Sequence, residues 1–395
     1  MDVASEAIIS DYTHVMEISI IINFVLFLAT AFYLLVHFGL IIGLKRLDDS
    51  ISNEQPFVSI IVAARNEEKN ICQLLQCLTH QTYSRCEIII INDRSTDKTA
   101  LLVADFQKEY SNITRIDITS PQGDMPSKKN ALQAGIEVSK GEIICFTDAD
   151  CFPASEWIEE LVKSFQSDVG LVAGYSPYQI PNTQTTTSGF FTSLFFKFIG
   201  YEEFRAAIWA AGSIGWNIGW LCTGRNLAYR RKVYDEVNGF EKIKMSISGD
   251  DDLFLQLVRR QTDWKIHYVK TQGSFVPTVP PINFWSFVEQ RKRHFSAAKF
   301  FTLPMMLFFF SYHSSNLLLL ISPILFMMSI VSLPVLIAAC CSKVLSDVLL
   351  FKYSHHTFDA HNFRRSFFLM EALYVLYNSL IGPLGFFRKF AWKQS

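Results

Sequence analysis

The sequence predicts an α/β domain built on a doubly wound sheet, joined to membrane-spanning helices at both of its ends. Two observations predict the membrane helices: half of the 395 residues are hydrophobic and 18% are charged, below the roughly 25% of ordinary soluble domains, and long uncharged stretches flank a more polar centre. A third observation predicts the sheet, because short β-branched runs alternate with helical patterns in that centre. We expect the α/β domain over residues 52–300.

The first membrane segment is expected over residues 18–44. This run contains no Asp, Glu, Lys or Arg, and it exceeds the roughly 20 residues that a helix needs to cross a hydrocarbon core. Residues 1–17 are acidic, unlike the basic start of a secretory signal, so the segment is expected to be a retained anchor. Because Lys45 and Arg46 follow it, we expect this side in the cytoplasm and residues 1–17 as a short extracytoplasmic tail.

The C-terminal membrane region is expected over residues 301–395, with two or three spans. The chain carries no charge from residue 300 to 342, with a turn predicted at 332–334, and another apolar stretch runs from 367 to 387. Four spans in all would place the basic tail at 388–393 outside, against the positive-inside rule. The last stretch therefore has two alternatives to spanning, a re-entrant segment or an interfacial one.

Two polar features bear on the membrane contacts. Lys343 and Asp347, four residues apart in an apolar run, are expected to neutralise each other near the end of a span. The aromatic stretch at 190–220 contains Glu202, Glu203 and Arg205, which favours an interfacial helix. We expect an integral protein of a bacterial inner membrane with a cytoplasmic α/β domain. The net charge of -1 gives no electrostatic support for nucleic-acid binding.

Three runs are expected to be parallel strands buried on both faces, at residues 58–63, 87–91 and 141–147. In doubly wound sheets, ligands bind beyond the carboxyl ends of the strands. The polar residues after these strands are therefore candidate site residues, and they lie at 65–68, 92–97 and 148–150. Glu68 and Asp97 are expected instead to cap helices.

Asp148 and Asp150, at the end of the third strand, are expected to bind a metal ion. Two carboxylates separated by one residue repel each other unless a cation lies between them. Oxygen ligands suit Mg²⁺ or Mn²⁺, which also bridge diphosphate oxygens. The pattern alone is common, and its position after a buried strand strengthens the prediction.

With these residues in place, the chain over residues 57–300 resembles family 2 glycosyltransferases of the GT-A (Rossmann-like) fold. The similarity is to the membrane branch that contains cellulose-synthase-like and ceramide-glucosyltransferase-like enzymes. The resemblance implies that Asp93 contacts the base and ribose of a UDP-sugar, in a pocket lined by Ala63 and Glu67. Lys128 matches a basic nucleotide-binding position, although the family's preceding glycine is absent. Asp148 would serve both the metal and the nucleotide sugar.

The acidic run Ser248–Gln256 is expected to supply the catalytic base, because inverting transfer needs a carboxylate to take the proton of the acceptor hydroxyl. One alignment with the family pattern places the base at Asp250 and another at Asp251, and Asp250 is favoured. A helix cap is the structural alternative. The segment 220–230 resembles the family's acceptor pocket, so Cys222 and Gly224 are expected to face the acceptor, with a buried turn as the alternative.

The segment Gln290–His294 resembles the family's Gln-x-x-Arg-Trp pattern. The resemblance implies that Gln290 and Arg293 contact the nucleotide sugar, with Arg293 neutralising the leaving diphosphate. His294 stands where the family has an acceptor-stacking Trp, which argues against a processive polymerase. A juxtamembrane basic cluster is the alternative interpretation.

The resemblance implies an inverting, metal-dependent hexosyltransferase that moves a sugar from a nucleotide sugar to a membrane lipid or lipid-linked acceptor. The nucleotide half would occupy residues 52–150 and the acceptor half residues 151–300. Two alternatives remain open at this point: a processive polysaccharide synthase and a catalytically inactive membrane scaffold.

Overall fold

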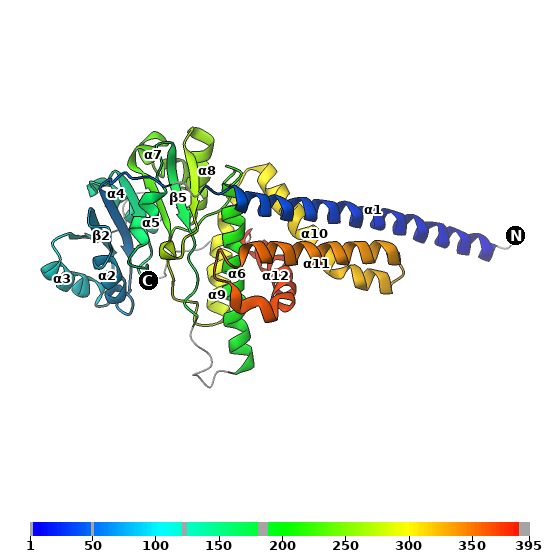
Figure 1. Cartoon of the computed structure of the whole chain (residues 1–395). Helices are drawn as coiled ribbons and strands as arrows, with labels where there is room; N and C mark the ends of the chain where they lie inside the picture. The colour runs from blue at the N-terminus through cyan, green and yellow to red at the C-terminus, as the bar shows by residue number, and fades with distance from the viewer. Residues whose placement is uncertain (1–2, 49–50, 121–124, 181–188, 387–395) are drawn as a thin grey trace.

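A computed structural model describes residues 3–48, 51–120, 125–180 and 189–386 of the protein. An α/β domain forms one end of the molecule, and a bundle of long helices extends away from it (Figure 1). The basic tail expected at 388–393 lies outside the described residues.

The α/β domain is organised on a mixed sheet of seven strands in the order β3-β2-β1-β4-β6-β5-β7. The strands predicted from the sequence are parallel neighbours here, with Ile61 beside both Ile89 and Phe146. β6 runs antiparallel to both β4 and β5, so the sheet is not wholly parallel. The strands are β1 (Val58–Ala64), β2 (Cys86–Asp93), β3 (Ile113–Ile118), β4 (Ile143–Phe146), β5 (Val169–Gly174), β6 (Leu227–Arg230) and β7 (Lys265–Val269).

Helices cover both faces of the sheet, because successive strand residues point to opposite sides. Ile60 and Ile88 belong to a core shared with α2 (Ile71–Thr79), α3 (Thr99–Glu109) and α5 (Trp157–Lys163). Ile61 and Ile89 belong to a second core shared with α4 (Ser127–Val138), α6 (Phe190–Ile214) and α8 (Asp252–Gln261). The remaining short elements are α7 (Arg231–Glu236), η1 (Glu241–Ile243), η2 (Gln272–Ser274), α9 (Phe284–Phe295) and η3 (Ser296–Phe300).

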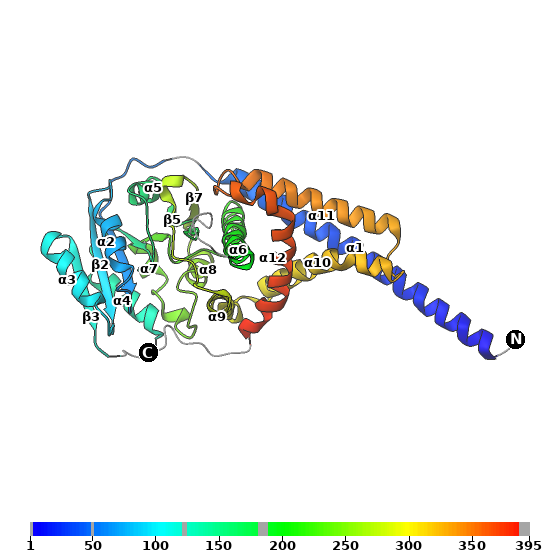
Figure 2. The same cartoon turned by 90° about the horizontal axis from the view of Figure 1, so that it is seen from below.

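Three helices lie side by side and lead away from the α/β domain: α1 (Val3–Arg46), α10 (Leu303–Met327) and α11 (Leu333–Ser354) (Figures 1 and 2). Four segments of the described chain are long and apolar enough to cross a membrane, namely Met16–Arg46, Leu303–Met327, Leu333–Ser354 and His361–Gly385. The last of these contains η4 (His361–Ser366), α12 (Phe367–Ile381) and the first residues of η5 (Gly382–Phe386).

Two helices lie at the junction between the α/β domain and the bundle. Figures 1 and 2 show α6 and α12 running across the direction of α1, α10 and α11 rather than alongside them. α6 is mostly buried from Phe198 onward, and even Arg205 has only 1% of its surface exposed. Its apolar composition is therefore explained by packing, and it is not among the segments suited to span a membrane.

Candidate active site

The first two residues of α4 connect the acids that follow β2 and β4. The Ser127 hydroxyl donates to Asp93 Oδ2 at 2.6 Å. The ammonium of the next residue, Lys128, lies 3.1 Å from Asp148 Oδ1 and 3.2 Å from Asp250 Oδ2. One helix start thus brings together the expected nucleotide, metal and base positions, which lie far apart in the sequence.

The loops after β1 and β2 hold each other in place. The backbone N–H of Asn66 donates to Ser95 Oγ at 3.0 Å, and the backbone N–H of Thr96 donates to Asn66 Oδ1 at 2.8 Å. Asp97 accepts from the backbone N–H of Glu68 at 3.0 Å and from that of Thr99, the first residue of α3, also at 3.0 Å. These bonds hold the partly buried Asp97 carboxylate against the start of α3, while the N-cap positions of α2 and α3 are Asn70 and Lys98 rather than the expected Glu68 and Asp97.

Asp93 is almost fully buried, with 1% of its surface exposed, and its carboxylate already has partners. Arg94 donates to it through Nε at 2.7 Å and through Nη2 at 3.1 Å. Ala63, near the end of β1, and Glu67, in the loop after β1, are also buried. The Glu67 Oε2 atom accepts a hydrogen bond from the Asn70 side chain at 2.9 Å. A nucleotide at this edge of the sheet would have to share or displace the Arg94 guanidinium.

The ion pairs of Lys128 set the charge of the central pocket. Burial alone would raise the pKa of Asp148, but the Lys128 ammonium and the Arg225 guanidinium outweigh burial and hold that pKa below its usual value. Burial likewise opposes the charge on Lys128, yet Asp148 and Asp250 raise its pKa. Both side chains are therefore charged at neutral pH, and a small cavity lies between them, lined also by Thr147.

The residues after β4 fit a hard divalent cation. Asp148 and Asp150 offer only oxygen ligands, which Mg²⁺ and Mn²⁺ prefer, and a third of the Asp148 side chain is exposed. Two carboxylates leave most coordination positions to water and phosphate oxygens, as in other phosphate-handling magnesium sites. The backbone of Asp150 is fixed, because its carbonyl accepts from Val279 N at 3.1 Å and from Thr278 Oγ1 at 3.2 Å.

Within the acidic run, Asp251 and Asp252 bind backbone groups. Asp251 accepts from the N–H of Asp252 at 2.7 Å, which caps α8, and from the N–H of Gly224 at 3.0 Å. Asp252 accepts from the N–H of Cys222 at 2.7 Å. These bonds tie the loop at 220–226 to α8 through its backbone, while Asp250 faces Lys128.

The same bonds place Cys222 and Gly224 beside the acids. Burial first, and then the nearby carboxylates, raise the pKa of the Cys222 thiol well above its ordinary value, so it stays protonated. A Cβ added at Gly224 would lie 3.4 Å from Asp250 Oδ2, so this glycine backs directly onto the expected base. Whether either residue contacts an acceptor stays a prediction.

Lys129 is a site residue that the sequence did not indicate. It is fully buried, and its ammonium donates to the carbonyl of Ser246 and, at 3.0 Å, to that of Ser248. It therefore anchors the segment that leads into Asp250. Only its adjacency to Lys128 could have suggested a role, because its partners are 117 and 119 residues away.

Two arginines of α9 have different surroundings: Arg291 packs against α6, and Arg293 lies near Asp148. Arg291 is buried in ion pairs with Glu202 at 2.5 Å and Glu203 at 2.7 Å, so it joins α9 to α6. Gln290 accepts from the Tyr178 hydroxyl at 3.2 Å. Arg293 is half-buried and lies close enough to Asp148 to help lower its pKa. The sequence did not indicate a structural role for Arg291.

His294 is neutral at physiological pH. Burial, and then the charges of Arg291, Arg293 and Arg225, lower the pKa of its imidazole well below the ordinary value. A neutral ring next to Arg293 adds no charge to the pocket. Whether this ring contacts an acceptor stays a prediction.

Comparison with known proteins identifies the class of this domain. The glycosyl transferase family 2 profile matches residues 59–237. The mannosyltransferase PcManGT from Pyrobaculum calidifontis, solved with GDP-Man and Mn²⁺, has the same fold at a TM-score of 0.52, with 18% identity over 92% of this chain and 99% of that one. The α/β domain is thus of the GT-A type.

Sequence relatives agree with this class. Glycosyltransferase AglE of Haloferax volcanii is 33% identical over 147 residues, 36% of this chain and 47% of that protein. The beta-monoglucosyldiacylglycerol synthase of Nostoc is 30% identical over 216 residues, 54% of this chain and 43% of that protein. The matches span less than half the length of these relatives. The α/β domain is therefore similar to glycosyltransferase family 2 over residues 59–237, and the described part of the chain carries helices suited to a membrane.

Proposed function

We propose that this protein transfers a sugar from a nucleotide sugar, with a UDP-sugar as the expected donor, to a membrane lipid or lipid-linked acceptor, with inversion at the anomeric carbon. The observation that carries the proposal is the position of Lys128, whose ammonium lies within 3.2 Å of both Asp148 and Asp250. Donor-side and acceptor-side acids thereby meet at one pocket beyond the carboxyl end of the sheet, where ligands of such folds bind.

On the donor side, Asp93, Ala63 and Glu67 would line the nucleotide pocket, next to the start of α4. Asp148 and Asp150 would hold Mg²⁺ or Mn²⁺, which would neutralise charge on the diphosphate. Lys128 and Arg293 would add fixed positive charge where the leaving diphosphate becomes more negative. The crystallised Pyrobaculum enzyme, which shares the fold, contains GDP-Man and Mn²⁺.

On the acceptor side, Asp250 would take the proton of the acceptor hydroxyl as its oxygen attacks the anomeric carbon from the face opposite the diphosphate. We prefer Asp250 to Asp251 because both oxygens of Asp251 accept backbone N–H groups. The Lys128 ammonium beside Asp250 keeps that carboxylate in place. Movement of the Lys128 ammonium from Asp250 toward the diphosphate would leave the Asp250 carboxylate able to accept the proton.

A lipid acceptor is supported by a cavity of about 410 Å³ at the junction with the helices. Its walls include Phe152, two residues after Asp150, and Phe358 and Phe363, which lie between α11 and α12. Aromatic side chains on both sides suit an amphipathic ligand. Among the relatives, the Nostoc protein is named as a synthase of a glucosyl lipid.

Variants of the metal-binding pair test the proposal. Purified full-length Asp150→Ala should lose Mn²⁺-dependent hydrolysis of UDP-sugars, because one of the two carboxylates that position the diphosphate is gone. Asp263→Ala, which changes an exposed loop carboxylate, should keep the wild-type rate. Equal activity of Asp150→Ala and wild type, with both proteins folded, would rule out the metal assignment.

A further inference from the structure

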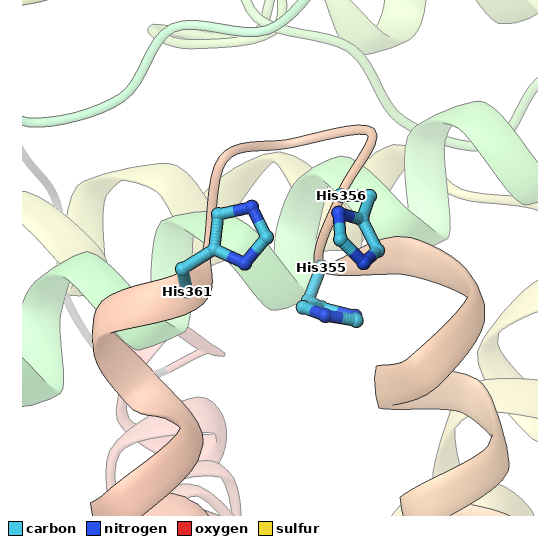
Figure 3. A group of neighbouring side chains, drawn as sticks. All are labelled: His355, His356 and His361. Carbon is cyan, nitrogen blue, oxygen red and sulfur yellow. The ribbon is translucent and has the colours of Figure 1, made fainter.

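We propose that His355, His356 and His361 form a second metal site, for a transition ion of the Zn²⁺ class, at the turn between α11 and α12. The three imidazoles each offer a ring nitrogen, and these nitrogens lie within 4.8 Å of one another. Figure 3 shows His355 and His356 at the end of one helix and His361 at the start of the next, with the rings gathered around a common space.

The ligand chemistry differs from that of the expected active-site metal. Neutral imidazole favours Zn²⁺, Cu²⁺, Ni²⁺ and Co²⁺, whereas Mg²⁺ prefers oxygen ligands. Zn–N bonds of about 2.0–2.1 Å place tetrahedral ligand nitrogens roughly 3.4 Å apart. Small ring rotations would close the present spacing to that value. Three histidines would leave one position for water or another ligand.

His355 is preset for coordination. Its Nδ1 lies 3.0 Å from the carbonyl of Phe351 and 3.1 Å from that of Lys352, so Nδ1 carries the proton and the lone pair is on Nε2. A backbone carbonyl that holds the other ring nitrogen is a usual feature of metal-binding histidines. His355 is also 94% buried and stacks on the Phe351 ring with centroids 5.1 Å apart, which fixes its plane.

The other two histidines are exposed and available. Within the part of the chain that the structure describes, the ring nitrogens of His356 and His361 have no hydrogen-bond partner. Their ring centroids lie 4.6 Å apart, and that of His356 lies 4.1 Å from that of His355. A metal ion coordinated by the three rings would hold them at this close spacing.

Arg364 contacts the unprotonated nitrogen of His355, with Nη2 2.6 Å from Nε2. Its side chain is exposed, so it can swing into solvent when a metal ion binds. The guanidinium therefore competes with the metal, and its removal should strengthen metal binding. Substitution of Arg364 should therefore raise metal affinity, whereas substitution of a histidine should lower it.

The position of the site suggests what metal binding would do. Phe358 and Asp359, in the turn between His356 and His361, and Phe363 of η4 line the 410 Å³ cavity at the junction. The Phe358 ring packs edge-on against Tyr175 of the α/β domain, with centroids 5.3 Å apart. A bound ion would join the ends of α11 and η4 and so stiffen one wall of that cavity.

The test uses the full-length protein without a polyhistidine tag, stripped of metal and held in lipid nanodiscs. Co²⁺ is added in the presence of excess Mg²⁺, which fills carboxylate sites. We expect the strong visible absorption of four-coordinate Co²⁺, saturating at one equivalent and removed by Zn²⁺. His356→Gln and His361→Gln should each lose this absorption, while His80→Gln, at an exposed histidine elsewhere, should keep it. Arg364→Gln should reach half-saturation at lower Co²⁺.

Both histidine substitutions lie at exposed positions, and circular dichroism checks that the variants fold. Absence of the four-coordinate spectrum from wild type, or its persistence in both His356→Gln and His361→Gln, would overturn the proposal. UDP-sugar hydrolysis is measured in parallel with Mn²⁺. Loss of the cobalt spectrum with hydrolysis retained separates this site from the one at Asp148 and Asp150.

Discussion

Three adjacent carboxylates, Asp250, Asp251 and Asp252, have different surroundings although the sequence makes them look alike. Asp251 and Asp252 each accept backbone N–H groups. Burial, and then the charge of Asp250, raise the pKa of Asp251, because several acids crowd together at the start of this helix. Asp250 instead faces the Lys128 ammonium at 3.2 Å. The role of each acid follows from its partner.

Paired substitutions separate these roles. Asp250→Asn should lower the rate of sugar transfer by about 10²–10⁴-fold, the usual contribution of a general base, with a small change in stability. Asp251→Ala should lower the free energy of unfolding by roughly 1–2 kcal/mol, because it removes a helix cap and leaves the Gly224 N–H without its acceptor. Transfer kinetics and thermal unfolding measure the two effects. A larger rate loss in a folded Asp251→Asn than in Asp250→Asn would reverse the assignment.

At this scale the sequence could predict residue types but not contacts. Asp148 and Asp150 were predicted because they follow a recognisable strand, and Lys128 was predicted because it matches a basic position of the resembled family. Lys129 and Arg291 were not, because their partners are distant in sequence: Ser246 for Lys129, and Glu202 and Glu203 for Arg291. A local pattern cannot show which of two neighbouring basic residues points into the pocket and which supports it.

At the scale of the elements, the backbones of α1 and α6 come into contact at glycine residues. A Cβ at Gly43 would lie 2.0 Å from the carbonyl oxygen of Gly212, and a Cβ at Gly215 would lie 1.9 Å from that of Gly43. No side chain fits between the two backbones. The Trp216 indole, just after α6, also donates to the carbonyl of Gly39 at 2.8 Å, so α1 is attached directly to the C-terminal end of α6.

A glycine pair in α1 and α6 offers a matched test. Gly215→Ala should lower the free energy of unfolding by about 1–3 kcal/mol, the usual cost of overpacking, because α1 must move off α6. Gly39→Ala, in the same anchor, meets nothing within 4 Å and should be neutral or stabilising, since alanine favours helix. Unfolding of the purified protein in detergent measures both. Equal stability of the two variants would show that the helices do not pack in this way.

The composition of residues 190–220 predicted an interfacial helix in the region of α6, but it could not predict the contacts of that helix. Its charged residues favoured a helix at the membrane boundary, and Figure 1 shows it across the inner ends of the long helices. Its charges are buried, however, because Glu202 and Glu203 meet Arg291, and Arg205 meets Glu371 of α12 at 2.9 Å. Such tertiary pairing leaves no mark on local sequence.

Across the whole molecule, polar side chains join the long helices within their apolar bundle. Lys343 Nζ lies 3.0 Å from Asp347 Oδ2, in agreement with the self-neutralising pair expected from the sequence. The pair also binds other helices: Lys343 donates to Asn316 at 2.7 Å and to the Tyr33 hydroxyl at 3.0 Å. His37 lies 3.5 Å from Asp347. The pair therefore connects α1, α10 and α11.

A double-mutant cycle tests this network. Asp347→Leu should lower the free energy of unfolding by about 3 kcal/mol or more, because Lys343 loses its counter-charge in an apolar setting. Lys343→Met combined with Asp347→Leu should recover much of that loss, since no unpaired charge remains. Detergent unfolding of the single and double variants gives the coupling energy. Additive losses would show that the two charges act independently.

The arrangement of helices also supports a proposal for topology. Figure 2 shows the C-terminal end of α1, the start of α10 and the C-terminal end of α11 on the side of the α/β domain. Lys45, Lys299 and Lys352 lie at or next to these helix ends, so they would share that side if α1, α10 and α11 span the membrane and α12 lies across its boundary. This distribution satisfies the positive-inside rule with a cytoplasmic catalytic domain. Three spans would avoid the conflict with the positive-inside rule that four spans pose.

The most direct test of sugar transfer to a lipid uses the purified protein in nanodiscs made with a bacterial lipid extract and a UDP-sugar labelled in the sugar. With Mn²⁺ present, label should enter the organic phase in a product of single-sugar mass increment. It should not do so with a chelator or with the Asp150→Ala variant. Label found only in a water-soluble polymer, or in no product from any UDP-sugar, would contradict the account.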